Sequence, residues 1–220
     1  TATEYASDQV IAQHNEMAYS NSWPLRIGFY CLLPSSAGGQ TPIADSRQIY
    51  QAIPKAIRDE FEAKKIRYIR NYSELDLPWQ EVFCTQDKQQ VEHYCQQNQL
   101  SCEWFADNRL RTSQVNLAVQ QHPFSQQKVW FNQAHLFHRS NLPDEVASAL
   151  LNSVGKDNLP RHAEFGDGSE IDSAYLTIIR AVIDSHKISF DWQKQDLMLL
   201  DNMLFSHGRA PFEGQRKVLV

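Results

Sequence analysis

The sequence predicts a mainly β fold, a β-sandwich or jelly roll that carries helical insertions. Short apolar runs bounded by turn residues recur near both ends of the 220-residue chain, a pattern typical of strands. Segments in the middle repeat apolar residues every three or four positions, which is typical of helices. A chain of this length can bury roughly 70% of its unfolded surface. We therefore expect one domain over residues 1–220, with helical insertions at roughly 46–100 and 143–185.

The first predicted elements are two strands followed by two helices. Residues 25–33, LRIGFYCLL, are mostly large and apolar and are closed by the turn-forming segment PSSAGGQ, so they predict a buried strand. TPIADS, at 41–46, predicts a second short strand. Residues 46–65 have helical apolar spacing that Pro54 interrupts, because proline removes a helical hydrogen bond and clashes with the preceding turn. Two short helices are expected there.

The middle of the chain predicts strands around a surface helix. IRYIRNY, at 66–72, alternates its side chains with a period of two and predicts a strand. TQDKQQVEHYCQQN, at 85–98, has an acidic residue near its start and a narrow apolar stripe, so it predicts a surface helix. Further strands are expected around SCEWFA, at 101–106, and QVNLAVQ, at 114–120.

The last part of the chain predicts two helices and then a return to strands. Residues 144–154 and 171–183 repeat Leu, Val or Ile at three- and four-residue spacing and predict helices. KISFDW at 187–192, DLMLLDNMLFSHG at 196–208 and RKVLV at 216–220 are short apolar runs separated by turn residues. They predict the closing strands of the fold.

The composition argues against several classes of protein. The formal net charge is −5 and no block of basic residues occurs, which argues against a nucleic-acid partner. The apolar runs are shorter than the roughly 18 to 20 residues that a membrane span needs. The four cysteines lack CxxC spacing and no signal peptide opens the chain, so we expect reduced thiols and a cytoplasmic protein. The oligomeric state cannot be read from these features.

A candidate metal site is suggested by IAQHNEMAYSNSWP, at 11–24. On an extended strand His14 and Glu16 would point to the same side, where one divalent cation could contact both. Such a pair is common by chance, so a third ligand must come from elsewhere. His207 is the best candidate, because an apolar strand is expected to end at Ser-His-Gly. Two imidazoles and one carboxylate are the ligand set of non-haem Fe(II) oxygenases.

The other histidines provide one rival set of ligands. His135 and His138 lie in WFNQAHLFHRS and would suit a zinc or cupin-like site. The remaining four are expected at the surface: His93, His122, His162 and His186.

Four ordered motifs carry a resemblance to a known family. HNE at 14–16, GGQTPIADSR at 38–47, VWFNQAHLFH at 129–138 and LLDNMLFSHGRAPFEGQRKVLV at 199–220 resemble the TauD/TfdA family. Within that family they resemble the clavaminate-synthase-like and syringomycin-biosynthesis-like branch. The resemblance implies a double-stranded β-helix and an Fe(II)- and 2-oxoglutarate-dependent oxygenase that uses O2. It also implies that the part of the family fold preceding the HxE motif is missing from this sequence.

The resemblance assigns roles residue by residue. His14, Glu16 and His207 match the metal ligands, and Thr41 matches a threonine that contacts the cosubstrate. Arg216 matches the arginine that binds the distal carboxylate of 2-oxoglutarate, and its planar fork suits that task better than a lysine would. Arg209 competes for this role but fits a structural or substrate-side residue better.

Further positions bear on the substrate. Asn132 and Gln133 would line the pocket or act as turn-stabilising amides, and Tyr19 belongs to the stretch 17–23 that would form a pocket wall or lid. Taurine-type members carry a second arginine where this chain has Val220, which argues against a sulfonate substrate. A carboxylate at position 16 argues for hydroxylation or desaturation rather than halogenation.

The expected function follows from the resemblance. The chain would oxidise an unactivated C–H bond of a small molecule, such as an amino acid, free or attached to a carrier protein, with release of succinate and CO2. Two alternatives stay open. One is a zinc-dependent hydrolase that uses His135 or His138, and the other is a catalytically silent metal-binding jelly-roll module.

Overall fold

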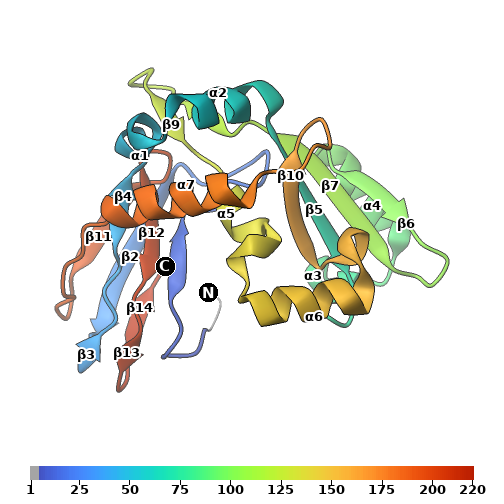
Figure 1. Cartoon of the computed structure of the whole chain (residues 1–220). Coiled ribbons are helices and arrows are strands. Elements are labelled where there is room, and N and C mark those ends of the chain that lie inside the picture. The colour runs from blue at the N-terminus through green and yellow to red at the C-terminus, as the bar shows by residue number, and fades with distance from the viewer. Residues whose placement is uncertain (1–4) are drawn as a thin grey trace.

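The computed structural model describes residues 5–220, and its mostly β architecture with few helices confirms the predicted fold class. Figure 1 shows a sandwich of strands on one side of the molecule and a separate four-stranded sheet on the other. Helix α7 crosses in front of the sandwich and α2 lies above the region between the two strand systems (Figure 1). The candidate metal site belongs to the sandwich.

Two three-stranded antiparallel sheets form the sandwich, with the orders β1-β12-β4 and β11-β2-β14. Ile27 and Phe29 of β2 pack with Ile43 of β4 and Phe205 of β12, so one apolar cluster joins the two sheets. Alternate residues of β2 are buried because successive side chains of a strand point to opposite faces. The strands are β1 (Ile11–His14), β2 (Arg26–Leu33), β4 (Ile43–Asp45), β11 (Leu197–Asp201), β12 (Phe205–Arg209) and β14 (Lys217–Leu219).

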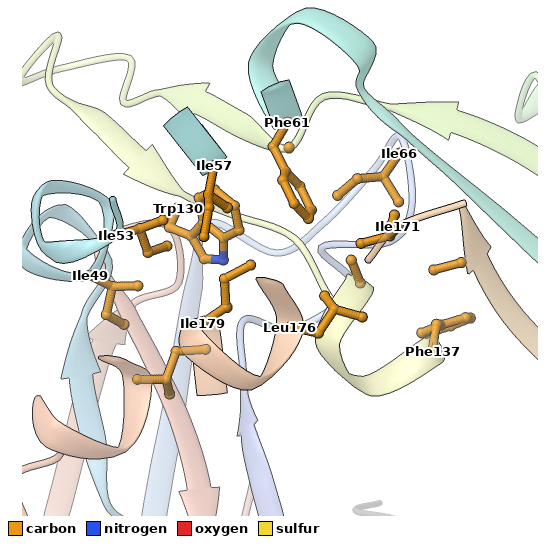
Figure 2. Close-up of a cluster of buried hydrophobic side chains, with 14 of the residues drawn as sticks. Ile49, Ile53, Ile57, Phe61, Ile66, Trp130, Phe137, Ile171, Leu176 and Ile179 are labelled. Atoms are coloured by element: carbon orange, nitrogen blue, oxygen red, sulfur yellow. The ribbon is translucent and has the colours of Figure 1, made fainter. Parts of the chain in front are cut away.

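The largest core lies under the helices (Figure 2). Its members are buried aliphatic and aromatic side chains from α1, α2, α7 and the strand β9, and they connect the sandwich to the second sheet. Pro54 separates α1 from α2, as predicted, and Asp45 caps α1 by accepting a hydrogen bond from the backbone N–H of Arg47. The helices are α1 (Ser46–Ala52), α2 (Lys55–Lys64) and α7 (Ser173–Ser185), and β9 covers Lys128–Trp130.

The second sheet has the strand order β10-β5-β7-β6 and is antiparallel throughout. Helix α4 (Lys88–Gln97) packs on it through Val91 and Cys95, which join Tyr72 of β5 and Leu110 of β7 in a third apolar cluster. The strands are β5 (Ile66–Tyr72), β6 (Ser101–Trp104), β7 (Leu110–Asn116) and β10 (Arg161–Phe165).

Short elements complete the described chain. The two-stranded pairs are β3 (Ala37–Gly38) with β13 (Phe212–Glu213) and β8 (Val119–Gln121) with β9. The remaining helices are α3 (Trp79–Val82), α5 (Ala134–Phe137) and α6 (Asp144–Val154), with 3-10 turns at Arg139–Asn141 and Lys156–Asn158. Within residues 5–220, none of the helices combines the length and apolar character that crossing a membrane requires.

Two of the predicted strands are wrong in part. Residues 187–192 form only an isolated bridge at Ile188, because Phe190 and Trp192 turn inward to pack against the sandwich core. Residues 196–208 are two strands rather than one, since the chain turns at 202–204 between β11 and β12. His207 therefore lies in the middle of β12 instead of at the end of a strand.

Candidate metal centre and the cavity beside it

His14 and His207 face each other across neighbouring strands. His14 is the last residue of β1 and pairs in register with His207 of β12. Their ring centroids lie 4.4 Å apart. The close pairing of β1 and β12 depends on Gly208, because a Cβ at this position would stand 2.5 Å from the carbonyl oxygen of Ile11. Strand pairing alone thus brings together two histidines that are distant in sequence.

Glu16 joins the two histidines from a turn rather than from a strand. The prediction that His14 and Glu16 share one strand face is wrong, because β1 ends at His14 and Glu16 lies in the turn that follows. Met17 adopts a positive φ of 55°, which turns the chain away directly after Glu16. The Glu16 carboxylate still lies 3.8 Å from Nε2 of His14. One donor atom from each of His14, Glu16 and His207 lies within 4.8 Å of the others.

Asn202 holds Glu16 in place through the backbone. Its side-chain oxygen accepts a hydrogen bond of 2.7 Å from the Glu16 N–H, and its amide nitrogen donates one of 3.0 Å to the Glu16 carbonyl. Asn15 points away from the metal site and donates to the Asn202 carbonyl and to Ser46 Oγ. Asn202 was not predicted from the sequence. Its burial and its place in the turn between two strands follow from the fold, and the apolar pattern around it gives no signal of this role.

The protonation states suit metal binding. Nδ1 of His14 donates to the carbonyl oxygen of Ala12 at 2.8 Å, which leaves the lone pair of Nε2 facing Glu16. Burial lowers the pKa of His207 to about 3, so its imidazole is neutral at neutral pH. The His14 imidazole lowers the pKa of Glu16 more than burial raises it, which keeps the carboxylate ionised. A neutral imidazole at His207, an ionised carboxylate at Glu16 and the inward-facing Nε2 of His14 can together bind a divalent cation.

The rival ligands do not form such a group. Nε2 of His135 points at the carbonyl oxygen of Gln13, at 3.0 Å, and Nδ1 of His138 is hydrogen-bonded to Ser140. Across residues 5–220, the group of His14, Glu16 and His207 is the one in which three metal-binding side chains converge.

Thr41 and Arg216 lie together, just before the strands β4 and β14 respectively. Arg216 donates from Nε to the carbonyl oxygen of Gly39 at 2.9 Å, and its Nη2 lies 3.4 Å from Thr41 Oγ1. Gly39 permits this approach, because a Cβ there would stand 3.0 Å from Arg216 Cδ, and its φ of +72° favours glycine. Nε1 of Trp192 donates to the same Thr41 oxygen at 3.0 Å. The threonine is thus rigidly held beside the guanidinium.

A cavity of about 440 Å³ begins at Met17, the residue that follows Glu16. Met17 and Tyr19, from the turn after Glu16, form one wall. The second sheet supplies Tyr68, Arg70 and other side chains that form the floor, and the segment around α4 supplies the far wall. Its volume falls within the range typical of small-molecule sites.

Other residues predicted near the substrate have their hydrogen-bonding groups engaged within the fold. Asn132 donates to the Ala118 carbonyl and accepts from the Ala134 N–H, and Gln133 donates to the Asn15 carbonyl. These contacts correspond to the turn-stabilising alternative. Arg209 donates to three backbone carbonyls of the segment 5–9.

Two of the histidines predicted at the surface are buried instead. Nε2 of His122 lies 3.1 Å from the carboxylate of Asp201. The ring of His162 packs against that of His138, with ring centroids 5.3 Å apart. Tertiary contacts bury both rings although their sequence neighbours are polar.

Comparison with known proteins gives the family. The family model described as "Taurine catabolism dioxygenase TauD, TfdA family" matches residues 1–220. The chain belongs to the TauD/TfdA family. The Dapdiamide synthesis protein DdaC of Enterobacter agglomerans is 46% identical over 221 residues, which is 100% of this chain and 67% of that protein. A clavaminate synthase-like protein of Arabidopsis thaliana is 30% identical over 232 residues, which is 100% of this chain and 66% of that protein.

These relatives agree with the predicted branch of the TauD/TfdA family, and this chain spans about two thirds of their length. A solved structure with a similar fold is asparagine oxygenase in complex with Fe(II), 2S,3S-3-hydroxyasparagine and succinate. Its TM-score is 0.52 at 12% sequence identity, with 94% of this chain and 46% of that chain covered. The likeness shows that this TauD/TfdA member shares the fold of that oxygenase.

Proposed function

We propose that this protein is an Fe(II)- and 2-oxoglutarate-dependent oxygenase that hydroxylates or desaturates an unactivated C–H bond of an amino-acid-like small molecule. The observation that carries the proposal is the convergence of His14, Glu16 and His207, with donor atoms within 4.8 Å of one another. Two nitrogen ligands and one oxygen ligand on one side of an ion leave positions open for other molecules, as this class of oxygenase requires.

The donor set fits iron on grounds of its own chemistry. The hydrogen bond from Nδ1 of His14 to the Ala12 carbonyl oxygen fixes the ring so that Nε2 is on the side of the ligands, and the ring need not rotate to bind. His207 is buried by its neighbours and has an Nδ1 without a hydrogen-bond partner in the described part of the chain. A bound Fe(II) would supply the oxidation chemistry with O2, while these residues fix its position.

Arg216 and Thr41 are proposed to hold 2-oxoglutarate. Among the described residues Arg216 has no acidic partner within ion-pairing distance, so its charge is available to a carboxylate. The inner face of β2 links the two ends of this site. The ring centroids of Phe29 and His207 lie 5.1 Å apart. Cys31 lies two residues further along β2. Burial raises the pKa of its thiol and the charge of Arg216 lowers it, so Arg216 lies near Cys31.

Residues two apart on a strand are separated by about 7 Å, which matches the scale of a five-carbon dicarboxylate. One end of 2-oxoglutarate can therefore reach the metal while the distal carboxylate pairs with Arg216. We propose that the substrate enters the cavity on the other side of Glu16, where Tyr19 forms part of the wall. The fold shared with asparagine oxygenase supports an amino-acid-like substrate. The proposal includes a substrate attached to a carrier protein.

The test is succinate formation from 2-oxoglutarate by the purified protein, measured with Fe(II) and, separately, with Zn(II). We expect iron-dependent succinate from the native chain, none from Glu16→Ala, and undiminished formation by His186→Gln, a control away from the site. A folded protein that binds 2-oxoglutarate but forms no succinate with any of a broad panel of amino acids and peptides would favour the silent module. Hydrolytic activity with zinc that depends on His135 would favour the hydrolase.

A further inference from the structure

We infer that the cavity beside Glu16 binds a carboxylate of the substrate through Arg70, with the Tyr19 hydroxyl as a second donor. This inference rests on the proposed function and narrows its substrate to a small molecule with a free carboxylate, such as an amino acid or a short peptide, rather than one attached to a carrier through that carboxyl group. The observations that carry it are the charge balance, the burial and the position of these two side chains.

Arg70 carries a positive charge that is only partly balanced. It is the only charged residue among the described residues that line the cavity. Its Nη2 lies 3.7 Å from an oxygen of Asp76, and the same oxygen accepts a hydrogen bond of 3.1 Å from Nε of Arg161. Two guanidinium groups thus share one carboxylate and one positive charge remains. Arg161 does not line the cavity, so the surplus charge is presented there by Arg70.

The Arg70 guanidinium is also held and partly desolvated. Its side chain is 22% exposed, and its carbon Cζ lies 4.9 Å above the Tyr72 ring. Nε is buried and has no hydrogen-bond partner within residues 5–220. The guanidinium is partly exposed, and its planar fork can take a carboxylate in the bidentate geometry that arginine favours.

Tyr19 links this cation to the metal side of the cavity. Burial raises the pKa of Tyr19, the charge of Arg70 lowers it and the charge of Glu16 raises it, so both charged groups act on this phenol. Tyr19 therefore keeps its proton at neutral pH, and its O–H can donate a hydrogen bond. The hydroxyl makes no hydrogen bond within the described part of the chain, while the ring is held against Phe137 at 5.2 Å. A substrate bound to Arg70 and Tyr19 would extend toward Glu16.

The rest of the lining favours an anion with an apolar or amide-bearing body. Phe83, Leu100 and Phe137 are apolar, and Gln90 and Gln114 provide amides. Since no carboxylate is present among the lining residues, an ammonium group would gain no ion pair here. The alternative is that Arg70 acts only as a structural partner of Asp76, and the experiment separates the two roles.

The experiment is calorimetric binding to the metal-free protein, so that its outcome does not depend on turnover. The probes are N-acetyl amino acids and the matching N-acetyl amino-acid amides, which differ only in the carboxylate. The variants are Arg70→Gln, Tyr19→Phe and Arg161→Gln. Arg161→Gln is the matched control, because it removes the other arginine from the same ion pair without touching the cavity.

We expect at least one acid to bind the native protein about tenfold or more tightly than its amide. Arg70→Gln should abolish this preference, Tyr19→Phe should reduce it, and Arg161→Gln should reduce it less than Arg70→Gln does, because Arg161→Gln removes the surplus charge but keeps the donors that line the cavity. Equal affinities for acid and amide, no binding by any acid, or an equal loss in both arginine variants would overturn the inference. Failure of the proposed function would appear differently, as absence of iron-dependent succinate from a protein that still prefers the acids.

Discussion

Two pairs of packed histidines in this protein are similar in burial and in the distance between their rings, but they differ in what they can bind. His14 and His207 have ring centroids 4.4 Å apart, and His138 and His162 have centroids 5.3 Å apart. Burial lowers the pKa of His207 to about 3 and that of His138 and of His162 to about 4, so these rings are neutral at neutral pH. Both pairs also contain ring nitrogens without hydrogen-bond partners among the described residues.

The first pair differs by its carboxylate and its surroundings. Glu16 lies 3.8 Å from His14, and a cavity opens directly after Glu16. The acid whose charge acts on the second pair, Glu170, is held by Arg139 and Lys156 and joins no metal-binding group within residues 5–220. Buried neutral imidazoles are therefore not sufficient for a metal site. An anionic ligand, held in place and next to open space, makes the difference.

The largest effect is expected when the carboxylate of the first pair is removed. Glu16→Ala should lower iron-dependent succinate formation by at least about 100-fold, since even residues that merely support ligands are worth 10- to 100-fold. His162→Leu should leave the rate within about twofold, because the second pair takes no part. Initial rates at saturating 2-oxoglutarate measure both. A large loss in His162→Leu would abolish the distinction between the pairs.

A smaller effect is expected at Arg216. Arg216→Lys replaces a planar fork by a single ammonium group and should raise the KM for 2-oxoglutarate by about tenfold. The matched control is Arg209→Lys, because Arg209 also follows His207 closely but donates to backbone carbonyls of the segment 5–9. An unchanged KM in Arg216→Lys would place the cosubstrate elsewhere.

Asn202→Ala tests whether the support of Glu16 matters. Loss of both hydrogen bonds to the Glu16 backbone should weaken Fe(II) binding by about tenfold, as is usual for residues that orient metal ligands. Asn132→Ala is the control, because this buried amide also binds backbone groups but lies in a different turn. Both variants should lose stability, and only the first should lose affinity for iron. Equal iron affinity in the two variants would contradict the role assigned to Asn202.

Protonation of the second pair, His138 and His162, is expected to have the smallest effect on activity. Lowering the pH should nevertheless reduce the stability of the folded protein through this pair. The pKa of His162 is about 4 in the folded protein against an ordinary value of 6.5, because of burial and then the charges of His138, Lys156 and Arg139, with Glu170 opposing. Below pH 6.5 the unfolded chain binds a proton that the folded chain does not. Stability should therefore fall between pH 6.5 and 4, by an amount on the order of 1–3 kcal/mol.

His162→Leu should remove part of this dependence. Denaturant unfolding of the metal-free protein at pH 7 and pH 5 measures it for both proteins. The same slope of stability against pH in the native chain and in His162→Leu would contradict the assignment.

Much of the fold could be predicted because its signals are local. Pro54 separates two helices whatever the tertiary contacts around them. The helix predicted at 144–154 coincides with α6. The strand at 66–72 was predicted from its period of two. The single long strand predicted at 196–208 was wrong, because the apolar pattern does not show that Asn202 turns the chain.

The site was predictable in its ligands and not in its supports. The motif around His14 and the one around His207 are recognisable in order, but their meeting depends on the register of β1 and β12. Asn202 and Arg70 were missed because their roles come from tertiary contacts: a clamp on the Glu16 backbone and a shared ion pair beside a cavity. His162 was misplaced at the surface for the same reason.

The most direct test of the central claim is anaerobic titration of the metal-free protein with Fe(II), followed by 2-oxoglutarate, monitored in the visible spectrum. We expect one Fe(II) bound per chain and a weak charge-transfer band that appears when 2-oxoglutarate is added. The band should be absent in Glu16→Ala and unchanged in His162→Leu. A folded native protein that binds no Fe(II), or a band of equal intensity in Glu16→Ala, would contradict the claim that His14, Glu16 and His207 form the metal centre.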